Sequence, residues 1–82
     1  LEALARDCAA LPGKVVPLAL DVGSVAAIEA GLAEASAALG GLDVLINNAG
    51  VAEPERALEL TEAQWDAHLD INLKGCFFAA QS

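Results

Sequence analysis

The sequence predicts an α/β fold in which strands of a parallel sheet alternate with helices. Two short runs rich in apolar residues, 15–20 and 42–46, indicate strands. An amphipathic pattern over residues 24–39 separates them and indicates a helix. Because strand, helix and strand follow within about one βαβ unit, we expect the two strands to be parallel. The second run is almost uninterrupted in its apolar character, as in strands that are covered on both faces.

A helix is expected at the start of the chain. Its apolar face would consist of Leu1, Leu4, Cys8 and Leu11. Pro12-Gly13 ends it. The first strand follows over residues 15–20. Pro17 has no N–H to donate to a ladder, which places this strand at a sheet edge. Asp21-Val22-Gly23 ends the strand.

The central helix has clear signals at both ends. Ser24 is a favourable N-cap, because its hydroxyl can accept from the free N–H groups of the first turn. Gly40-Gly41 ends the helix, since glycine adopts the left-handed conformation that closes many helices. The apolar stripe between them comprises Val25, Ile28, Leu32, Ala35 and Leu39. The second strand begins directly afterwards.

A loop and a further helix complete the pattern. Residues 50–60 contain Pro54 and have no periodicity, which indicates a loop. Thr61 and Gln64 form the sequence signature of a capping box. The stripe of the helix that follows would comprise Trp65, Leu69, Asn72, Cys76 and Ala79 or Ala80. Asn72 lies in the middle of this apolar stripe, where an amide is costly unless it is hydrogen-bonded. It is therefore expected either to satisfy buried backbone or to belong to a site.

Composition excludes several classes of function. The 82 residues allow one small domain at most, and a net charge of −8 disfavours nucleic acid as a partner. No apolar run reaches the roughly 18 residues of a membrane span. Cys8 and Cys76 are too few for a disulfide framework or a metal site, which fits the reducing cytoplasm. His68 has no second metal ligand at helical spacing, so we expect a surface histidine and no metal site.

Asn47-Asn48-Ala49-Gly50 is the most informative stretch of the chain. It follows the second predicted strand, and open α/β sheets bind ligands outside the carboxyl ends of their strands. The two amides supply donors and acceptors. Ala49 and Gly50 add no bulk, so the backbone can approach a flat ligand closely. The sequence therefore predicts a ligand site at this edge of the sheet.

With these elements in order, the chain resembles the classical short-chain dehydrogenase/reductase family. Four features carry the resemblance: Asp21-Val22 at the end of a strand, the run 42–50 with its Asn-Asn-Ala-Gly motif, Trp65-Asp66, and the Asn-centred motif 71–75. Their intervals are also similar to those of the family. The resemblance covers residues 1–82. It implies the central fragment of an NAD(P)-binding domain with a Rossmann-like, doubly wound parallel sheet. The fragment would run helix, strand, helix, strand, loop, helix, and two absent strands would separate the two strands.

The resemblance also implies roles for individual residues. Asp21 and Val22 would contact the adenine of NAD or NADP. Asn48, Ala49 and Gly50 would line the adenosine ribose, whereas Asn47 would tie neighbouring strands together. Asn72 would be the catalytic asparagine, whose backbone carbonyl holds a proton-relay water at a kink in the helix. Two alternatives stay open: Asp21 caps the turn before Ser24, and Asn72 is a buried, helix-bending amide.

The implied function is that of an NAD(P)-dependent oxidoreductase interconverting an alcohol and a carbonyl by hydride transfer. The family's glycine-rich phosphate loop would precede Leu1, and its catalytic Ser and Tyr-x-x-x-Lys pair would follow Ser82. This part of the chain contains no Tyr and is expected to be inactive alone. The full-length protein would be a homo-oligomer, a dimer or tetramer, with Ile71 and Phe78 at the interface.

A non-catalytic sensor or scaffold that binds a dinucleotide is the alternative function. The Tyr-x-x-x-Lys pair in the longer protein would distinguish the two. A response-regulator-like module is disfavoured, because Asn47-Asn48 stands where its phosphoacceptor Asp would be.

Overall fold

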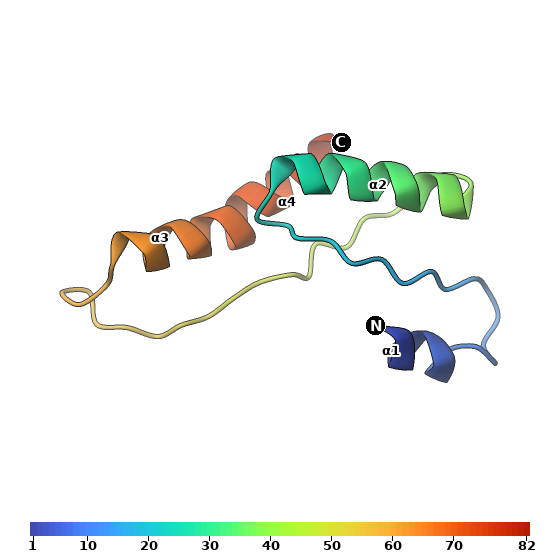
Figure 1. Cartoon of the computed structure of the whole chain (residues 1–82), viewed down its shortest axis with the longest axis horizontal. Helices are drawn as coiled ribbons and strands as arrows, with labels where there is room; N and C mark the ends of the chain where they lie inside the picture. Colours follow the sequence, from blue (N-terminus) through green and yellow to red (C-terminus); the bar gives the residue numbers. More distant parts are fainter.

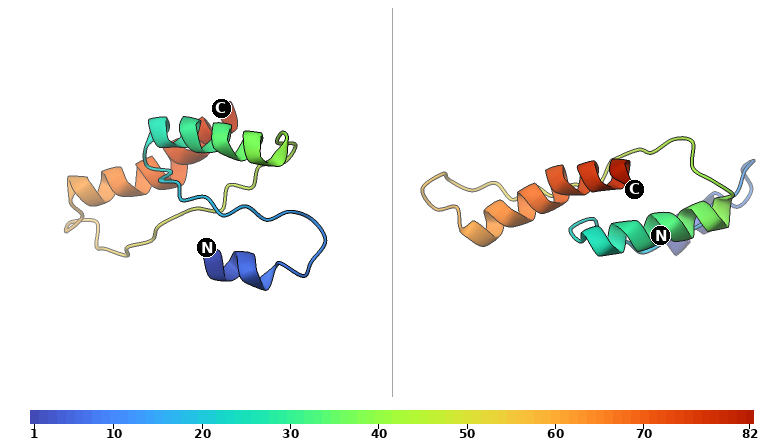
Figure 2. Two further views of the ribbon diagram at one scale, coloured as in Figure 1. Left: turned by 45° about the vertical axis from the view of Figure 1, so that its right-hand side comes forward. Right: turned by 90° about the horizontal axis from the view of Figure 1, so that it is seen from above.

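Helices joined by long extended segments make up the structure, a computed structural model that describes all of residues 1–82. The elements are α1 (Glu2–Asp7), α2 (Val25–Leu39), α3 (Glu62–Leu69), the π-helical segment η1 (Asp70–Lys74) and α4 (Gly75–Gln81). The last three follow one another without a break and form one rod (Figure 1). α4 packs against α2, as the right-hand view of Figure 2 shows.

The molecule is elongated, with extents of 49 × 27 × 17 Å and a radius of gyration of 15.4 Å. A compact domain of this length would have a radius of gyration of about 12 Å. Its accessible surface is 6317 Å². A folded monomer of this mass exposes about 4,600 Å². Ile28 of α2 is the only large side chain that is fully buried. Most of the chain's apolar surface therefore has nothing to cover it.

The predicted ends of α2 and the predicted start of α3 are confirmed. Ala27 N–H donates to Ser24 Oγ at 3.2 Å, and Gly40 closes α2 in the left-handed conformation with φ +78°. At the start of α3, Gln64 N–H donates to Thr61 Oγ1 and Thr61 N–H donates to Gln64 Oε1, so both halves of the capping box are present. These ends form as predicted because capping depends only on neighbouring residues.

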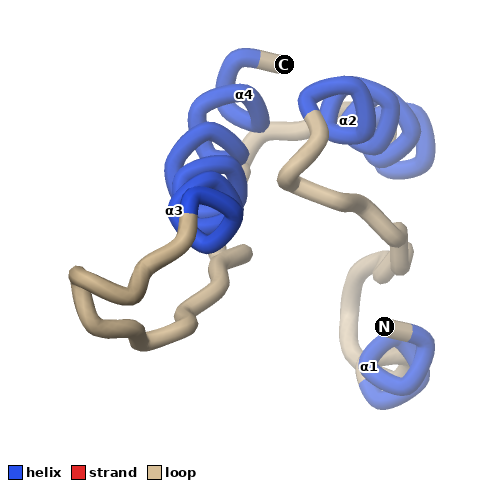
Figure 3. The backbone as a smooth tube through the Cα atoms, turned by 60° about the vertical axis from the view of Figure 1, so that its left-hand side comes forward, coloured by secondary structure: helices blue, strands red, loops and turns tan.

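The first helix is shorter than predicted. α1 ends at Asp7, and turns replace the helix from Cys8 onward. No other helix contacts α1, which lies apart from the rest in Figure 3. Leu4 and Leu11 remain 60% and 61% exposed. A short helix without a packed apolar face gains little stability in water, which explains the early end.

The prediction of two strands is wrong for this structure. Residues 15–20 and 42–46 are extended but join no ladder, and Figure 3 contains no strand. A strand needs a partner about 4.8 Å away to accept its N–H groups. The two runs form no ladder with each other or with any other segment. Val44 and Ile46 are consequently 78% and 81% exposed. The expectation that two absent strands separate these segments stays a prediction.

The faces of the last helix also differ from the predicted stripe. Trp65 and Leu69 were assigned to the core, but they are 56% and 40% exposed. Ile71 was assigned to an outer interface, but it faces Gly23 across the bend after the first extended segment. Trp65 and Leu69 are exposed because α3 contacts no element except η1. The π turn of η1 holds more residues than an α turn, so it rotates the residues around it relative to a regular α-helix.

Two rows of side chains, each made of residues four apart in sequence, lie along the rod. The inner row consists of Ile71, Gly75 and Ala79, of which the last two are buried. The outer row consists of the exposed side chains Trp65, Leu69, Leu73 and Phe77.

Gly75 marks the closest approach of the rod to the rest of the chain. A Cβ at this position would lie 2.7 Å from the Val22 carbonyl oxygen, which is backbone and cannot rotate away. Gly31 in α2 is different, since a Cβ there would lie 1.9 Å from Leu20 Cδ1, the end of a flexible side chain that is 36% exposed. Only glycine therefore fits at residue 75.

Gly75→Ala in the full-length protein is expected to lower stability by about 1–3 kcal/mol, because the added methyl group overlaps a fixed carbonyl. Gly31→Ala is the matched control, since both changes gain the same helix propensity. Thermal unfolding followed by circular dichroism measures both variants. An equal or higher midpoint for Gly75→Ala than for Gly31→Ala would contradict the assigned contact.

The isolated chain of residues 1–82 is expected to be molten or aggregated, because its apolar segments lack covering strands and each Å² left exposed forgoes about 25 cal/mol. Scanning calorimetry and light scattering test this. A single cooperative transition of a monomer would refute it.

Candidate functional site

The carboxyl ends of the two extended segments meet at one cavity of about 150 Å³. Val22 comes from the first segment, and Asn48 and Ala49 come from the second. The other lining residues are Leu20, Ile28, Leu32, Leu45, Ile46, Asn47, Ile71, Gly75, Cys76 and Ala79. Three of the predicted cofactor-binding residues are thus brought together from two segments that are far apart in sequence.

The cavity itself is too small for a dinucleotide. Ligand pockets usually measure about 300–1,000 Å³, and most of the side chains that line this one are apolar. It is the internal gap beneath the segment ends. A larger hollow of about 590 Å³ lies among α2, residues 42–45 and the end of α4. That hollow adjoins the start of the second segment rather than its carboxyl end, so it does not match a ligand site of an α/β sheet.

Asp21 closes the bend after the first segment. Gly23 N–H donates to Asp21 Oδ1 at 2.8 Å, and Ser24 N–H donates to the Asp21 carbonyl oxygen at 3.2 Å. The capping role that was left open for Asp21 is therefore present. The second carboxylate oxygen is outside this bond, and Val22 N–H donates to no other group of the chain. An acceptor and a donor thus stand on adjacent residues at the segment end.

Gly50 ends the Asn-Asn-Ala-Gly stretch against the last helix. A Cβ on Gly50 would lie 3.2 Å from Asn72 Oδ1, so the absence of a side chain lets the amide of Asn72 approach the backbone. Asn47 and Asn48 are exposed. The expected role of Asn47 between neighbouring strands stays a prediction, because no strand lies beside it here.

Asn72 holds the chain where it leaves this stretch. Its Oδ1 accepts from Val51 N–H at 2.8 Å, and its Nδ2 donates to the Val51 carbonyl oxygen at 2.9 Å. The amide of Asn72 therefore satisfies both backbone groups of one residue. This explains how a polar side chain is accommodated in the predicted apolar stripe.

The backbone around Asn72 is irregular. Gly75 N–H donates to the Asp70 carbonyl oxygen, five residues back, which is the bond of a π turn. Cys76 Sγ donates to the Asn72 carbonyl oxygen at 3.3 Å. Such single π turns inside helices occur frequently at functional sites. The carbonyl expected to hold a water thus lies within the bent part of the rod.

His68 has hydrogen-bond partners that the sequence did not indicate. Its Nε2 accepts from Glu53 N–H at 3.1 Å, and its Nδ1 lies 2.7 Å from the Gln64 carbonyl oxygen. It is half-buried, and both of its ring nitrogens bond to backbone groups, which the expectation of a surface histidine did not include. Its spacing of four residues from Asn72 was the available signal, because residues four apart share a helix face.

The remaining candidate features are structural. Cys8 and Cys76 are free and half-buried. No three His, Cys, Asp or Glu side chains come close enough to hold a metal ion. None of the helices has the length and apolar character that crossing a membrane requires.

The chain is similar in sequence and in backbone to members of one protein family. The family model for short chain dehydrogenase matches residues 1–82. A 3-oxoacyl-acyl-carrier-protein reductase from Thermotoga maritima is 36% identical over 81 residues, which cover 99% of this chain and 33% of the relative. The chain thus spans about a third of the length of this relative.

Solved structures agree with the sequence match. A short-chain dehydrogenase/reductase from Serratia marcescens superposes with a TM-score of 0.92 at 34% identity, over 98% of this chain and 33% of that one. A short chain dehydrogenase from Burkholderia cenocepacia, solved in complex with NADP, gives a TM-score of 0.92 at 29% identity with the same coverage of 98% and 33%. Since the family model matches every residue and the backbone follows these structures almost throughout, the chain belongs to the short chain dehydrogenase family.

Proposed function

We propose that the full-length protein is an NAD(P)-dependent oxidoreductase that interconverts an alcohol and a carbonyl. This chain would supply the middle of its Rossmann-like domain. The family match supports the class of reaction. The single observation that carries the proposal is the double hydrogen bond between Asn72 and Val51, because it fixes the predicted catalytic residue directly beside the predicted cofactor-binding stretch.

The residues at the segment ends suit a flat, polar cofactor. Asp21 keeps one carboxylate oxygen outside its own turn, and Val22 N–H is free to donate. An adenine offers the complementary pair, an exocyclic amine that donates and a ring nitrogen that accepts. Ala49 and Gly50 leave room for the ribose. The NADP complex of the Burkholderia cenocepacia protein supports NAD or NADP as the cofactor.

The two extended segments would become strands in the full-length protein. The N–H and C=O groups of both segments lack partners here. The side chains of the second segment are all exposed. Strands from the rest of the domain would pair with both segments and cover these apolar residues. The superposition on complete family members supports this arrangement, since the extended segments follow their backbones.

Asn72 would act at the reacting end of the site. The nicotinamide group, when bound, exchanges hydride with the substrate carbon. Asn72 would hold a water at its backbone carbonyl, and its side chain would keep that carbonyl in place through Val51. The π turn supports this role, because it changes the direction of the carbonyl groups within the rod.

A small-molecule alcohol or carbonyl is the proposed substrate, and the cytoplasm is the proposed location. The alternative, a dinucleotide-binding sensor or scaffold, would bind NAD(P)H without turnover. Cofactor binding measured by fluorescence together with hydride transfer assays distinguishes the two.

The outer row supports a homo-oligomer. Leu73 and Phe77 are 65% and 58% exposed, and no residue of the outer row carries a charge. Phe78, which was expected at the interface, is half-buried and packs edge-on against Phe77 with ring centroids 5.1 Å apart. We propose that the outer row, with Phe78 beside it, packs against its copy in a second subunit.

Asn72→Ala in the full-length protein is expected to lower kcat by roughly 10²- to 10⁴-fold, the contribution of a general acid/base relay, and to change cofactor Kd much less. Steady-state kinetics at saturating cofactor and substrate measure the effect. An unchanged kcat would leave Asn72 as a structural residue.

Asp21→Ala is expected to show the opposite pattern. Loss of one adenine contact should weaken cofactor binding by about 1–3 kcal/mol, with less effect on kcat. Isothermal titration with the cofactor measures it. An Asp21→Ala variant with parental cofactor affinity would leave only the capping role seen at Gly23.

Phe77→Glu is expected to dissociate the oligomer, because it places a charge within the proposed apolar contact. Leu58→Glu is the control: Leu58 is 101% exposed on the loop before α3 and lies outside the outer row. Light scattering measures the mass of both variants. The interface assignment fails when Phe77→Glu keeps the parental mass.

A further inference from the structure

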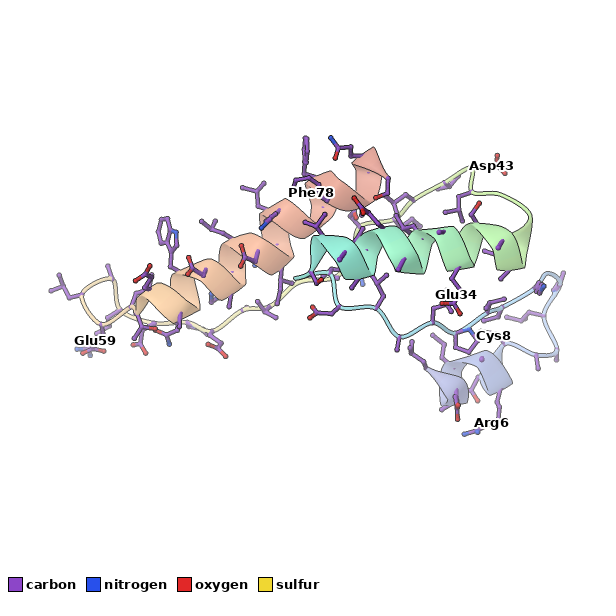
Figure 4. All side chains as sticks on the ribbon, turned by 45° about the horizontal axis from the view of Figure 1, so that its top comes forward. Arg6, Cys8, Glu34, Asp43, Glu59 and Phe78 are labelled. Atoms are coloured by element: carbon purple, nitrogen blue, oxygen red, sulfur yellow. The ribbon has the colours of Figure 1, made fainter.

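Few contacts hold the loop 51–60 that follows the Asn-Asn-Ala-Gly stretch. All of its residues are exposed, and Glu59 lies at one end of the molecule (Figure 4). Three hydrogen bonds tie the loop to the helical rod, two between Val51 and Asn72 and one in which Glu53 N–H donates to His68. Its other hydrogen bonds lie within the loop itself.

The tautomer of His68 follows from its two partners. The Gln64 carbonyl oxygen can only accept, so Nδ1 carries the proton and donates to it. Glu53 N–H can only donate, so Nε2 has a free lone pair and accepts. His68 is therefore a neutral imidazole that bridges the rod and the loop, with each nitrogen in a fixed role.

The support behind His68 is itself fixed. Gln64 belongs to the capping box, in which its N–H and side chain both bind Thr61 at the end of the loop. His68 binds Glu53 near the beginning of the same loop. One turn of α3 thus holds both ends of the loop, and the carbonyl that orients the imidazole lies within this turn.

We propose that His68 is a positioning residue for the substrate, which it serves by holding the start of loop 51–60 through its Nε2 acceptor. The inference rests on the proposed function. Gly50 lies next to the proposed cofactor site, and the loop continues directly from it. In α/β sheets the loops after strand ends enclose the ligand. Asn72 fixes Val51, and His68 fixes the path of the chain two residues further on.

Three substitutions separate the acceptor from the shape of the ring. His68→Gln keeps an acceptor, Oε1, at about the reach of Nε2. His68→Phe fills the same space without an acceptor. His68→Asn places its amide near Nδ1 and falls short of Glu53. Cofactor Kd and the thermal midpoint serve as controls for folding in each variant of the full-length protein.

Two measurements test the proposal. The first is substrate KM, which is expected to rise about three- to tenfold in the Phe and Asn variants, as expected for the loss of one hydrogen bond, and to return towards the parental value in the Gln variant. The second needs no activity: trypsin cleavage after Arg56, the only Lys or Arg in the loop, followed by mass spectrometry. Cleavage should be faster in the Phe and Asn variants and parental in the Gln variant.

The proposal is overturned when His68→Phe keeps the parental substrate KM, even where cleavage is faster. It is also overturned when His68→Gln behaves like His68→Phe, since the ring rather than its acceptor would then matter. A parental protein without turnover would end the proposed function instead, and cleavage after Arg56 would still decide whether His68 holds the loop.

Discussion

The hydrogen-bonded pair between Asn72 and the backbone of Val51 is the constraint on which the site depends. It joins the end of the second extended segment to the middle of the helical rod, two parts of the chain that are 21 residues apart. Both the N–H and the C=O of Val51 are used, so the segment can neither slide nor rotate against the rod without losing two bonds. Gly50 lacks a side chain where Asn72 approaches, which makes this geometry possible.

The π turn at η1 gives the rod its second property, two differently shaped faces. The small inner residues Gly75 and Ala79 follow η1 in α4, where they are buried on the side that faces Val22 and α2. The large apolar side chains of the outer row stay aligned on the opposite side. An unbroken α-helix would have rotated these rows gradually apart. The same local irregularity thus positions the catalytic candidate, the close contact at Gly75 and the proposed subunit interface.

The presence or absence of a packing partner explains which predicted elements formed and which did not. α2 has both caps and packs on α4, so it is long and regular. The segments at 15–20 and 42–46 have the residues of strands but no neighbouring strands, and α1 has an apolar face but no partner. In each case the local preference is present, and the partner that would turn it into stable secondary structure is missing.

The sequence by itself determined the features that depend on near neighbours: the caps at Ser24, Gly40 and Thr61, the family motifs, and Asn72 as a polar residue that needs partners. Tertiary structure decided everything that depends on distant residues. It alone paired Asn72 with Val51 and His68 with Glu53, because a side chain's partner across 21 or 15 residues is set by packing. It also decided that Ile71 faces inward and Trp65 outward. A helical period of 3.6 was assumed from the sequence, and the π turn that changes it is formed by backbone hydrogen bonds that no residue pattern here specified.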